Sequence, residues 1–192
     1  YIGQAIIKVL TGQRRVGKTF LLRQLMDYII KEDKKANIIY INKEHNDFKH
    51  IINASDLFEY VKSKISKSKK NYVFIDEIQE IDDFEIALRQ LLAEEFDLYC
   101  TGSNARMLSG DLATYISGRY IEFHISSLSY KEFLQIHKIE NNNNSLNKYI
   151  RYGGLPYLIH LPFDDEIVYG YLKSIYNSII LKDVVSRYNI RD

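Results

Sequence analysis

The stretch from Gly12 to Thr19 constrains this chain more than any other. It matches the G-x-x-x-x-G-K-[ST] pattern of a phosphate-binding loop at every fixed position. Such a loop needs a buried strand before it and a helix after it. An apolar run from Ala5 to Leu10 precedes it, and apolar residues recur at three- and four-residue steps from Lys18 to Ile30. We therefore predict that the loop joins a strand to a helix.

The residue types of this stretch suit a phosphate chain. Gly12 and Gly17 lack a Cβ atom, so the backbone can curve and wrap phosphates with N–H groups. Lys18 would reach the β- and γ-phosphates, and Thr19 is placed to ligate Mg²⁺. The alternative, a glycine-containing turn with an exposed lysine, does not explain the complete motif. The residues predicted to bind the nucleotide here are Gly12, Gln13, Arg14, Arg15, Val16, Gly17, Lys18, Thr19 and Phe20.

Two adjacent carboxylates form the second motif. Asp76 and Glu77 follow the apolar run from Tyr72 to Ile75, at the carboxyl end of a predicted strand, where ligands bind in open α/β sheets. We predict that Asp76 holds Mg²⁺ through its water shell and that Glu77 is the general base that polarises the attacking water. An isolated Asp-Glu pair is more often a turn or a cap, but the complete phosphate loop favours the functional interpretation.

Polar residues after the next predicted strand, residues 97–101, are candidates for contact with the γ-phosphate or the attacking water. They are Ser103 and Asn104, and the alternative is a polar turn. Arg119 precedes a fifth predicted strand, residues 120–125. It is either an arginine finger acting through self-association or a cation that stabilises the fold.

Composition limits the classes of protein to which this chain can belong. The 192 residues suffice for one domain with a small appendage, and the net charge of +1 argues against a globally basic nucleic-acid binder. The single cysteine, Cys100, lies in an apolar run, which indicates a buried thiol and a reducing compartment. No run approaches the roughly 20 apolar residues of a membrane span, so we expect a cytoplasmic protein without membrane contact. Because the chain begins with Tyr1, we expect a fragment of a longer protein.

The most basic run extends from Lys62 to Lys70. It would attract nucleic-acid phosphates, or it is a solvated helix end whose cations complement the helix dipole. The absence of interleaved aromatic residues favours the helix end.

The order of the predicted elements indicates two parts. Strands and helices alternate up to about residue 140, which predicts an α/β domain with a parallel sheet. In this part Ser55 is the predicted N-cap of one helix, and Ser129 with Glu132 forms a capping box that opens another. Residues 141–145 read as a polar linker and residues 146–192 as a helical lid, so the predicted domains are 1–140 and 146–192.

These motifs together resemble the AAA superfamily and, more narrowly, the prokaryotic AAA_14 ATP-binding proteins, which are usually followed by a DUF4143 domain. The resemblance rests on residues 12–19, 74–79, 101–104, 117–119, 128–134 and 152–156. It implies a P-loop NTPase fold of the ASCE type, with a five-stranded parallel sheet of order 5-1-4-3-2. It also implies that Lys18, Thr19, Asp76 and Glu77 are Walker A and B residues and that Pro156 packs on adenine. Relatives continue beyond residue 192.

The function that we predict is Mg²⁺-dependent ATP hydrolysis coupled to movement between the α/β domain and the lid. The alternative is a nucleotide-gated switch that holds ATP or ADP with little turnover. A small-molecule kinase would share the loop but would need several lid arginines, whereas Arg151, Arg187 and Arg191 are scattered. ATP is favoured over GTP because no guanine-reading Asn/Thr-Lys-x-Asp motif occurs.

Overall fold

The computed structural model describes residues 1–102, 116 and 118–180. They form two compact units, which are described separately below. The first unit comprises Tyr1–Gly12 and Lys18–Ile125, and the second comprises Gln13–Gly17 and residues from Ser126 onward.

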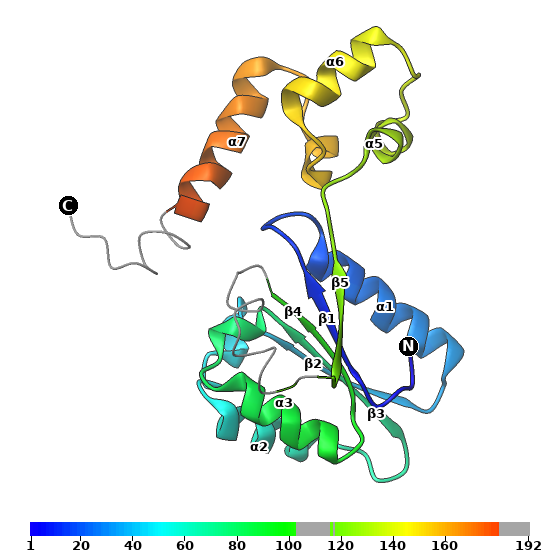
Figure 1. The fold of residues 1–192 in the computed structure, drawn as a ribbon, viewed down its shortest axis with the longest axis vertical. Helices are drawn as coiled ribbons and strands as arrows, with labels where there is room; N and C mark the ends of the chain where they lie inside the picture. Colours follow the sequence, from blue (N-terminus) through cyan, green and yellow to red (C-terminus); the bar gives the residue numbers. More distant parts are fainter. Residues whose placement is uncertain (103–115, 117, 181–192) are drawn as a thin grey trace, which may run out of the picture. The chain divides into compact units, whose positions relative to one another are not determined.

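The first unit alternates strands and helices, as the sequence predicts (Figure 1). Its strands are β1 (Ile7–Thr11), β2 (Ala36–Asn42), β3 (Lys70–Asp76), β4 (Asp97–Thr101) and β5 (Tyr120–His124). Its described helices are α1 (Lys18–Glu32), α2 (Ala54–Lys64) and α3 (Phe84–Ala93), with short 3₁₀ turns η1 (Asn46–Phe48) and η2 (Ile78–Glu80).

The five strands form one parallel sheet of order β2-β3-β4-β1-β5. This is the predicted order 5-1-4-3-2 read from the opposite edge strand. The fold class, a P-loop type α/β sheet, is therefore confirmed. Because every strand runs in the same direction, all five carboxyl ends meet at one edge of the sheet. The phosphate loop follows β1, and Asp76 ends β3, at that edge.

Helices cover both faces of the sheet (Figure 1). On one face, Ile7 and Val9 of β1 pack in a large core with residues of α2 and α3. On the other face, Leu10 packs with Leu22 and Met26 of α1. Residues of β1 thus alternate between two buried faces, which is why its sequence is a continuous apolar run rather than an alternating one.

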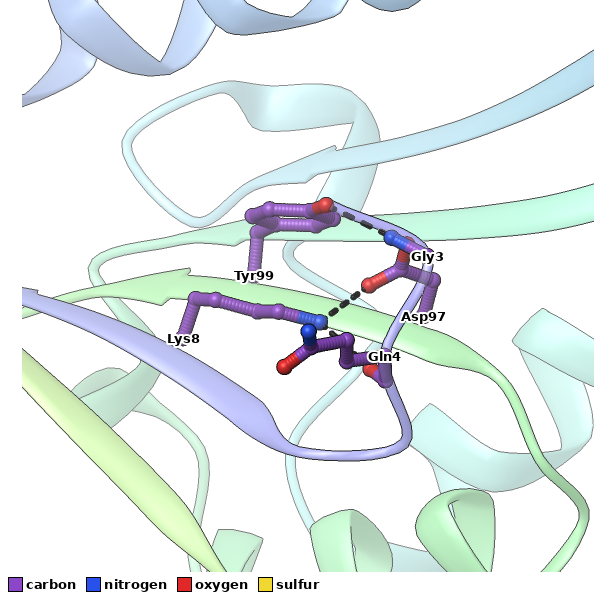
Figure 2. Close-up of polar contacts among 5 residues, drawn as sticks. All are labelled: Gly3, Gln4, Lys8, Asp97 and Tyr99. Carbon is purple, nitrogen blue, oxygen red and sulfur yellow. Dashed lines mark hydrogen bonds and ion pairs between the residues drawn. The ribbon is translucent and has the colours of Figure 1, made fainter. Parts of the chain in front are cut away.

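A buried ion pair lies on the α1 side of the sheet, near the amino ends of the strands. The ammonium of Lys8 in β1 is 2.5 Å from Asp97 Oδ1 in β4 and also donates to the carbonyl of Gln4 (Figure 2). Asp97 Oδ2 accepts from the Gly3 N–H at 2.6 Å and from the Tyr99 hydroxyl at 3.2 Å. Burial lowers the pKa of Lys8, although Asp97 opposes this effect. The pair anchors the N-terminal segment to the centre of the sheet.

Two helix starts show how local capping decides boundaries. The α2 helix begins earlier than predicted, because the side chain of Asn53, not Ser55, accepts from the backbone N–H groups of Ser55 and Asp56. The predicted capping box of Ser129 and Glu132 is confirmed, and it opens α5 (Tyr130–His137).

The second unit is helical. Besides α5 it contains α6 (Asn143–Tyr152), the 3₁₀ turn η4 (Pro156–His160) and α7 (Asp165–Ile179). The polar linker predicted at residues 141–145 is wrong, because Asn142 caps α6 by accepting from the Ser145 N–H at 3.0 Å. The compact units instead divide between Ile125 and Ser126, ahead of α5. None of the described helices has the length and apolar character that crossing a bilayer requires.

Candidate functional site

The phosphate loop leaves the carboxyl end of β1 and leads directly into α1. The backbone takes positive φ angles at Gly12 (139°), Arg15 (66°) and Gly17 (101°). Lys18, the first residue of α1, is 5% exposed, and its ammonium donates to the Gly12 carbonyl at 2.9 Å. Thr19 follows within the first turn, which contains no acidic residue. Because the N-terminus of a helix carries a partial positive charge, this end of α1 favours an anion.

Asp76 is the centre of a second group of polar contacts at the same edge. Its side chain is fully buried, and Oδ1 accepts from the Thr101 hydroxyl at 2.5 Å. Its Oδ2 accepts from the Tyr40 hydroxyl of β2 at 3.3 Å. Burial and the negative charge of Asp76 both raise the pKa of Tyr40, so this phenol remains a donor. Side chains from β2 and β4 thus hold the carboxylate that ends β3.

Thr101 also binds the neighbouring residue. Its Oγ1 accepts from the Glu77 N–H at 3.0 Å while donating to Asp76. Thr101 ends β4, which lies between β3 and β1, so one hydroxyl links the two carboxylate residues to the strand next to the phosphate loop. Sequence reasoning missed Thr101 and Tyr40. The signal for Thr101 was available, since it is the polar residue that closes a buried strand.

Glu77 leaves β3 in the left-handed conformation, with φ 57° and ψ 53°. This backbone region costs a residue with a side chain of order 1–3 kcal/mol and often marks a functional site. The Glu77 carboxylate accepts a hydrogen bond from Gln79 Nε2. Sequence reasoning gave Gln79 no role, although it belongs to the motif that carried the family resemblance.

The hard oxygen atoms of Thr19 and Asp76 fit the coordination chemistry of Mg²⁺. The described residues contain no group of three or more His, Cys, Asp or Glu side chains that could cage a metal by themselves. A magnesium ion here would therefore depend on phosphate oxygens and water for most of its ligands, as Mg²⁺ in nucleotide sites usually does.

The second unit contains the other residues predicted to contact the nucleotide. Pro156 is the first residue of η4, and a Cβ atom built on Gly17 would lie 3.9 Å from its Cγ. The guanidinium of Arg15 lies over the Tyr171 ring, 5.5 Å from its centroid. Gly154 has a packing role, because an added Cβ would lie 2.1 Å from the Leu128 carbonyl oxygen. Adenine packing by Pro156 stays a prediction.

Arg119 lies at the opposite edge of the sheet from the phosphate loop of its own chain. It immediately precedes β5, whose first residue, Tyr120, pairs with Ile7 at the amino end of β1. A parallel strand of five residues spans about 16 Å, so Arg119 does not reach the loop after β1. An arginine finger at this position would therefore act on a neighbouring copy of the chain. That role and the alternative, a cation that stabilises the fold, both stay predictions.

Three further predictions have separate outcomes. Ser103 and Asn104 are outside the described residues. In the basic run, α2 ends at Lys64, and Lys62 pairs with Glu94 at 2.5 Å, which fits the helix-end interpretation.

Cys100 is fully buried, and burial raises the pKa of its thiol to about 12, as expected of an inert core cysteine.

Four features of the site define the class of this protein. They are a strand, a glycine-containing loop, a helix that starts with Lys-Thr, and a buried Asp followed by Glu at the same sheet edge. It is a P-loop protein with a nucleotide-binding, ATPase-type site. The family model described as "AAA domain", AAA_14, matches residues 4–134. The chain belongs to this AAA_14 family, as the sequence motifs indicated.

The relatives are similar over almost the whole chain. An uncharacterized protein of Haemophilus influenzae is 36% identical over 193 residues, covering 97% of this chain and 48% of its own length. An uncharacterized protein of Methanocaldococcus jannaschii is 35% identical over 200 residues, covering 97% of this chain and 43% of its own length. The chain thus spans less than half the length of these curated relatives.

Among solved structures, AMPPCP-bound DnaA from Aquifex aeolicus is similar with a TM-score of 0.48 and 18% identity. The match covers 97% of this chain and 59% of DnaA. At this level of similarity the assignment of class depends on the family model and on the site, not on the structural match.

Proposed function

We propose that this chain binds ATP with Mg²⁺ and hydrolyses the bond to the γ-phosphate. The observation that carries the proposal is that Thr101 ties Asp76 and Glu77 together at the sheet edge from which the phosphate loop rises. A Walker-type site needs a cation-holding carboxylate and a base at this edge.

Each residue has a chemical role in this proposal. Lys18 and the N-terminal N–H groups of α1 bind the β- and γ-phosphates, and Thr19 and Asp76 hold the magnesium ion and its water shell. Bound Mg²⁺ would neutralise charge that develops on the phosphate oxygens. Glu77 accepts a proton from the attacking water as the water adds to the γ-phosphorus and the bond to ADP breaks.

We further propose that the nucleotide cycle is coupled to movement of the helical second unit. Gln13–Gly17 groups with the second unit, whereas Gly12 and Lys18 belong to the first. A nucleotide that orders residues 13–17 would therefore act on backbone of the second unit. A switch with little turnover would use the same residues and is distinguished by the experiment below.

The experiment compares the wild type with Glu77→Gln in steady-state phosphate release and in Mg²⁺-ATP binding. We expect equal affinity and a turnover reduced by about 10²- to 10⁴-fold in the variant. Glu80→Gln, an exposed carboxylate in the same turn, is the matched control and should behave like the wild type. Tight nucleotide binding with negligible wild-type turnover would favour the switch, and equal turnover of wild type and Glu77→Gln would refute Glu77 as the base.

A further inference from the structure

Arg15 occupies a position of the phosphate loop whose backbone conformation favours glycine. The loop takes positive φ angles at Gly12 (139°), Arg15 (66°) and Gly17 (101°). A residue with a Cβ atom adopts this region only at a cost in free energy, and it stays there when surrounding contacts hold it. The curve of the loop at Arg15 therefore depends on contacts that its side chain or its neighbours make.

The side chain of Arg15 makes a contact of this kind with an aromatic ring of the second unit. Its guanidinium lies over the ring of Tyr171 in α7, 5.5 Å from the ring centroid. A cation is attracted to the electron-rich face of an aromatic ring, and the planar guanidinium of arginine suits this geometry. Both residues belong to the second unit, so the contact is internal to one compact body.

Tyr171 is itself fixed by packing. Its ring stacks on that of Tyr157, with centroids 5.2 Å apart and an angle of 30° between the ring planes. It also packs against a small buried cluster of Tyr152, Leu158 and Val168. Because these contacts already restrict the tyrosine ring, holding Arg15 adds little further ordering cost on the α7 side. The ring is therefore suited to act as a fixed anchor.

The end of the loop lies next to the same unit. A Cβ atom built on Gly17 would lie 3.9 Å from Cγ of Pro156, the residue that opens η4. Val16, between Arg15 and Gly17, is buried. Two points of the loop, at Arg15 and at Gly17, are therefore close to side chains of α7 and η4.

We propose that Tyr171 is a positioning residue for the phosphate loop, whose ring anchors Arg15 and so keeps the loop in the curved form that wraps phosphate. This inference rests on the proposed function, because it names a contact through which a nucleotide on the loop would act on the second unit. The effect is reciprocal: if the contact favours the curved loop, a phosphate chain that orders the loop strengthens the contact by the same factor. The anchor therefore makes α7 responsive to nucleotide.

Substitutions from both sides of the contact test the proposal. Arg15→Met removes the cation and Tyr171→Leu removes the ring, and isothermal titration measures binding of Mg²⁺-AMPPNP, an ATP analogue with an imide bridge to the γ-phosphate. We expect each single variant to bind about two- to fivefold more weakly, and the double variant to bind no more weakly than either single one. Tyr176→Leu is the matched control. Tyr176 lies in the same helix and is 63% exposed, so this variant should bind like the wild type.

A third substitution separates an anchor from a direct contact between Arg15 and the nucleotide. Arg15→Gly loses the same guanidinium but adopts a positive φ angle without strain. We expect Arg15→Gly to bind more tightly than Arg15→Met, and Tyr171→Leu to have no further effect when it is combined with Arg15→Gly. Equal losses of affinity in Arg15→Gly and Arg15→Met, with no loss in Tyr171→Leu, would overturn the anchor in favour of a direct contact.

Amide hydrogen exchange, followed by mass spectrometry, measures the response of α7. In the wild type we expect nucleotide to slow exchange in peptides that contain Tyr171, and we expect this protection to be lost in Arg15→Met. Thermal unfolding without nucleotide checks that each variant is folded. Tyr171→Phe keeps the ring and its stacking, so it should retain both the affinity and the protection.

The outcomes separate this inference from the proposed function. Wild-type affinity and wild-type protection of α7 in folded Arg15→Met, with an active wild type, overturn the anchor and leave ATP hydrolysis standing. A wild type that binds nucleotide without turnover overturns hydrolysis, and the anchor is then decided by affinity and exchange alone. A wild type that binds no nucleotide overturns both.

Discussion

Two buried carboxylates at opposite edges of the same sheet have different partners. Asp97, at the amino end of β4, pairs with the Lys8 ammonium and also accepts from a backbone N–H and a tyrosine hydroxyl. Asp76, at the carboxyl end of β3, accepts from two hydroxyl groups, and the ion pairs of the described residues include no cation for it.

The difference fits a structural role for Asp97 and the magnesium-holding role that we propose for Asp76. A buried carboxylate that has its own ammonium group needs nothing more, and it holds the N-terminal segment in place. A buried carboxylate held only by hydroxyl groups is oriented but not neutralised, so it remains available to a cation or its water shell. The predictions below test this contrast.

The largest effect on stability is expected at the ion pair of Lys8 and Asp97. Lys8→Met leaves Asp97 charged, buried and without its cation, so we expect the free energy of unfolding to fall by about 3–5 kcal/mol. For a chain of this length that lowers the melting temperature by roughly 10 °C. Urea unfolding and calorimetry measure both quantities.

A second substitution controls for the lost volume of the lysine. Adding Asp97→Asn to Lys8→Met removes the unpaired charge while keeping an acceptor for the Gly3 N–H. We expect this double variant to recover much of the lost stability. A single Lys8→Met variant that loses less than about 1 kcal/mol would contradict the structural role of the pair.

A smaller effect on stability, of opposite sign, is expected at Asp76. Asp76→Asn removes a buried charge that has no described cation, so without nucleotide the free energy of unfolding should stay unchanged or rise by up to about 2 kcal/mol. Isothermal titration should show that Mg²⁺ no longer strengthens ATP binding. A strong loss of stability would show that Asp76 is mainly structural, like Asp97.

The smallest effect on stability is expected at His137, in the second unit. The His137 ring lies against Phe133 and Phe163, at centroid distances of 4.3 and 4.8 Å, and its Nε2 has no partner among the described residues. Burial lowers the pKa of His137 below its ordinary 6.5, and the positive charge of Lys148 adds to this.

The folded state thus binds this proton less readily than the unfolded state. The stability that His137 contributes is complete above about pH 6.5 and is lost as the pH falls from there toward its lowered folded value. Urea unfolding at several pH values should show the decline in the wild type. In His137→Leu the decline should be weaker, and an equal slope in both proteins would contradict this assignment.

Local patterns in the sequence were sufficient for most of the fold. The loop from Gly12 to Thr19, the strand that ends in Asp76 and the Ser129 capping box each depend on a few neighbouring residues, so their spacing alone indicated their structure. Local patterns failed at residues 141–145, where a run of asparagines looked like a linker but supplies the N-cap of α6. The polar composition of a cap and of a loop is the same.

The sequence by itself determined the class of fold, the phosphate loop and the two carboxylates, because a motif and its flanking strand and helix are continuous in the chain. Only the tertiary structure decided which residues support them. Thr101 and Tyr40 reach Asp76 because β2, β3 and β4 are neighbours, and Lys8 meets Asp97 because β4 lies beside β1. Strand pairing joins residues that are far apart in sequence, so no local pattern records these contacts.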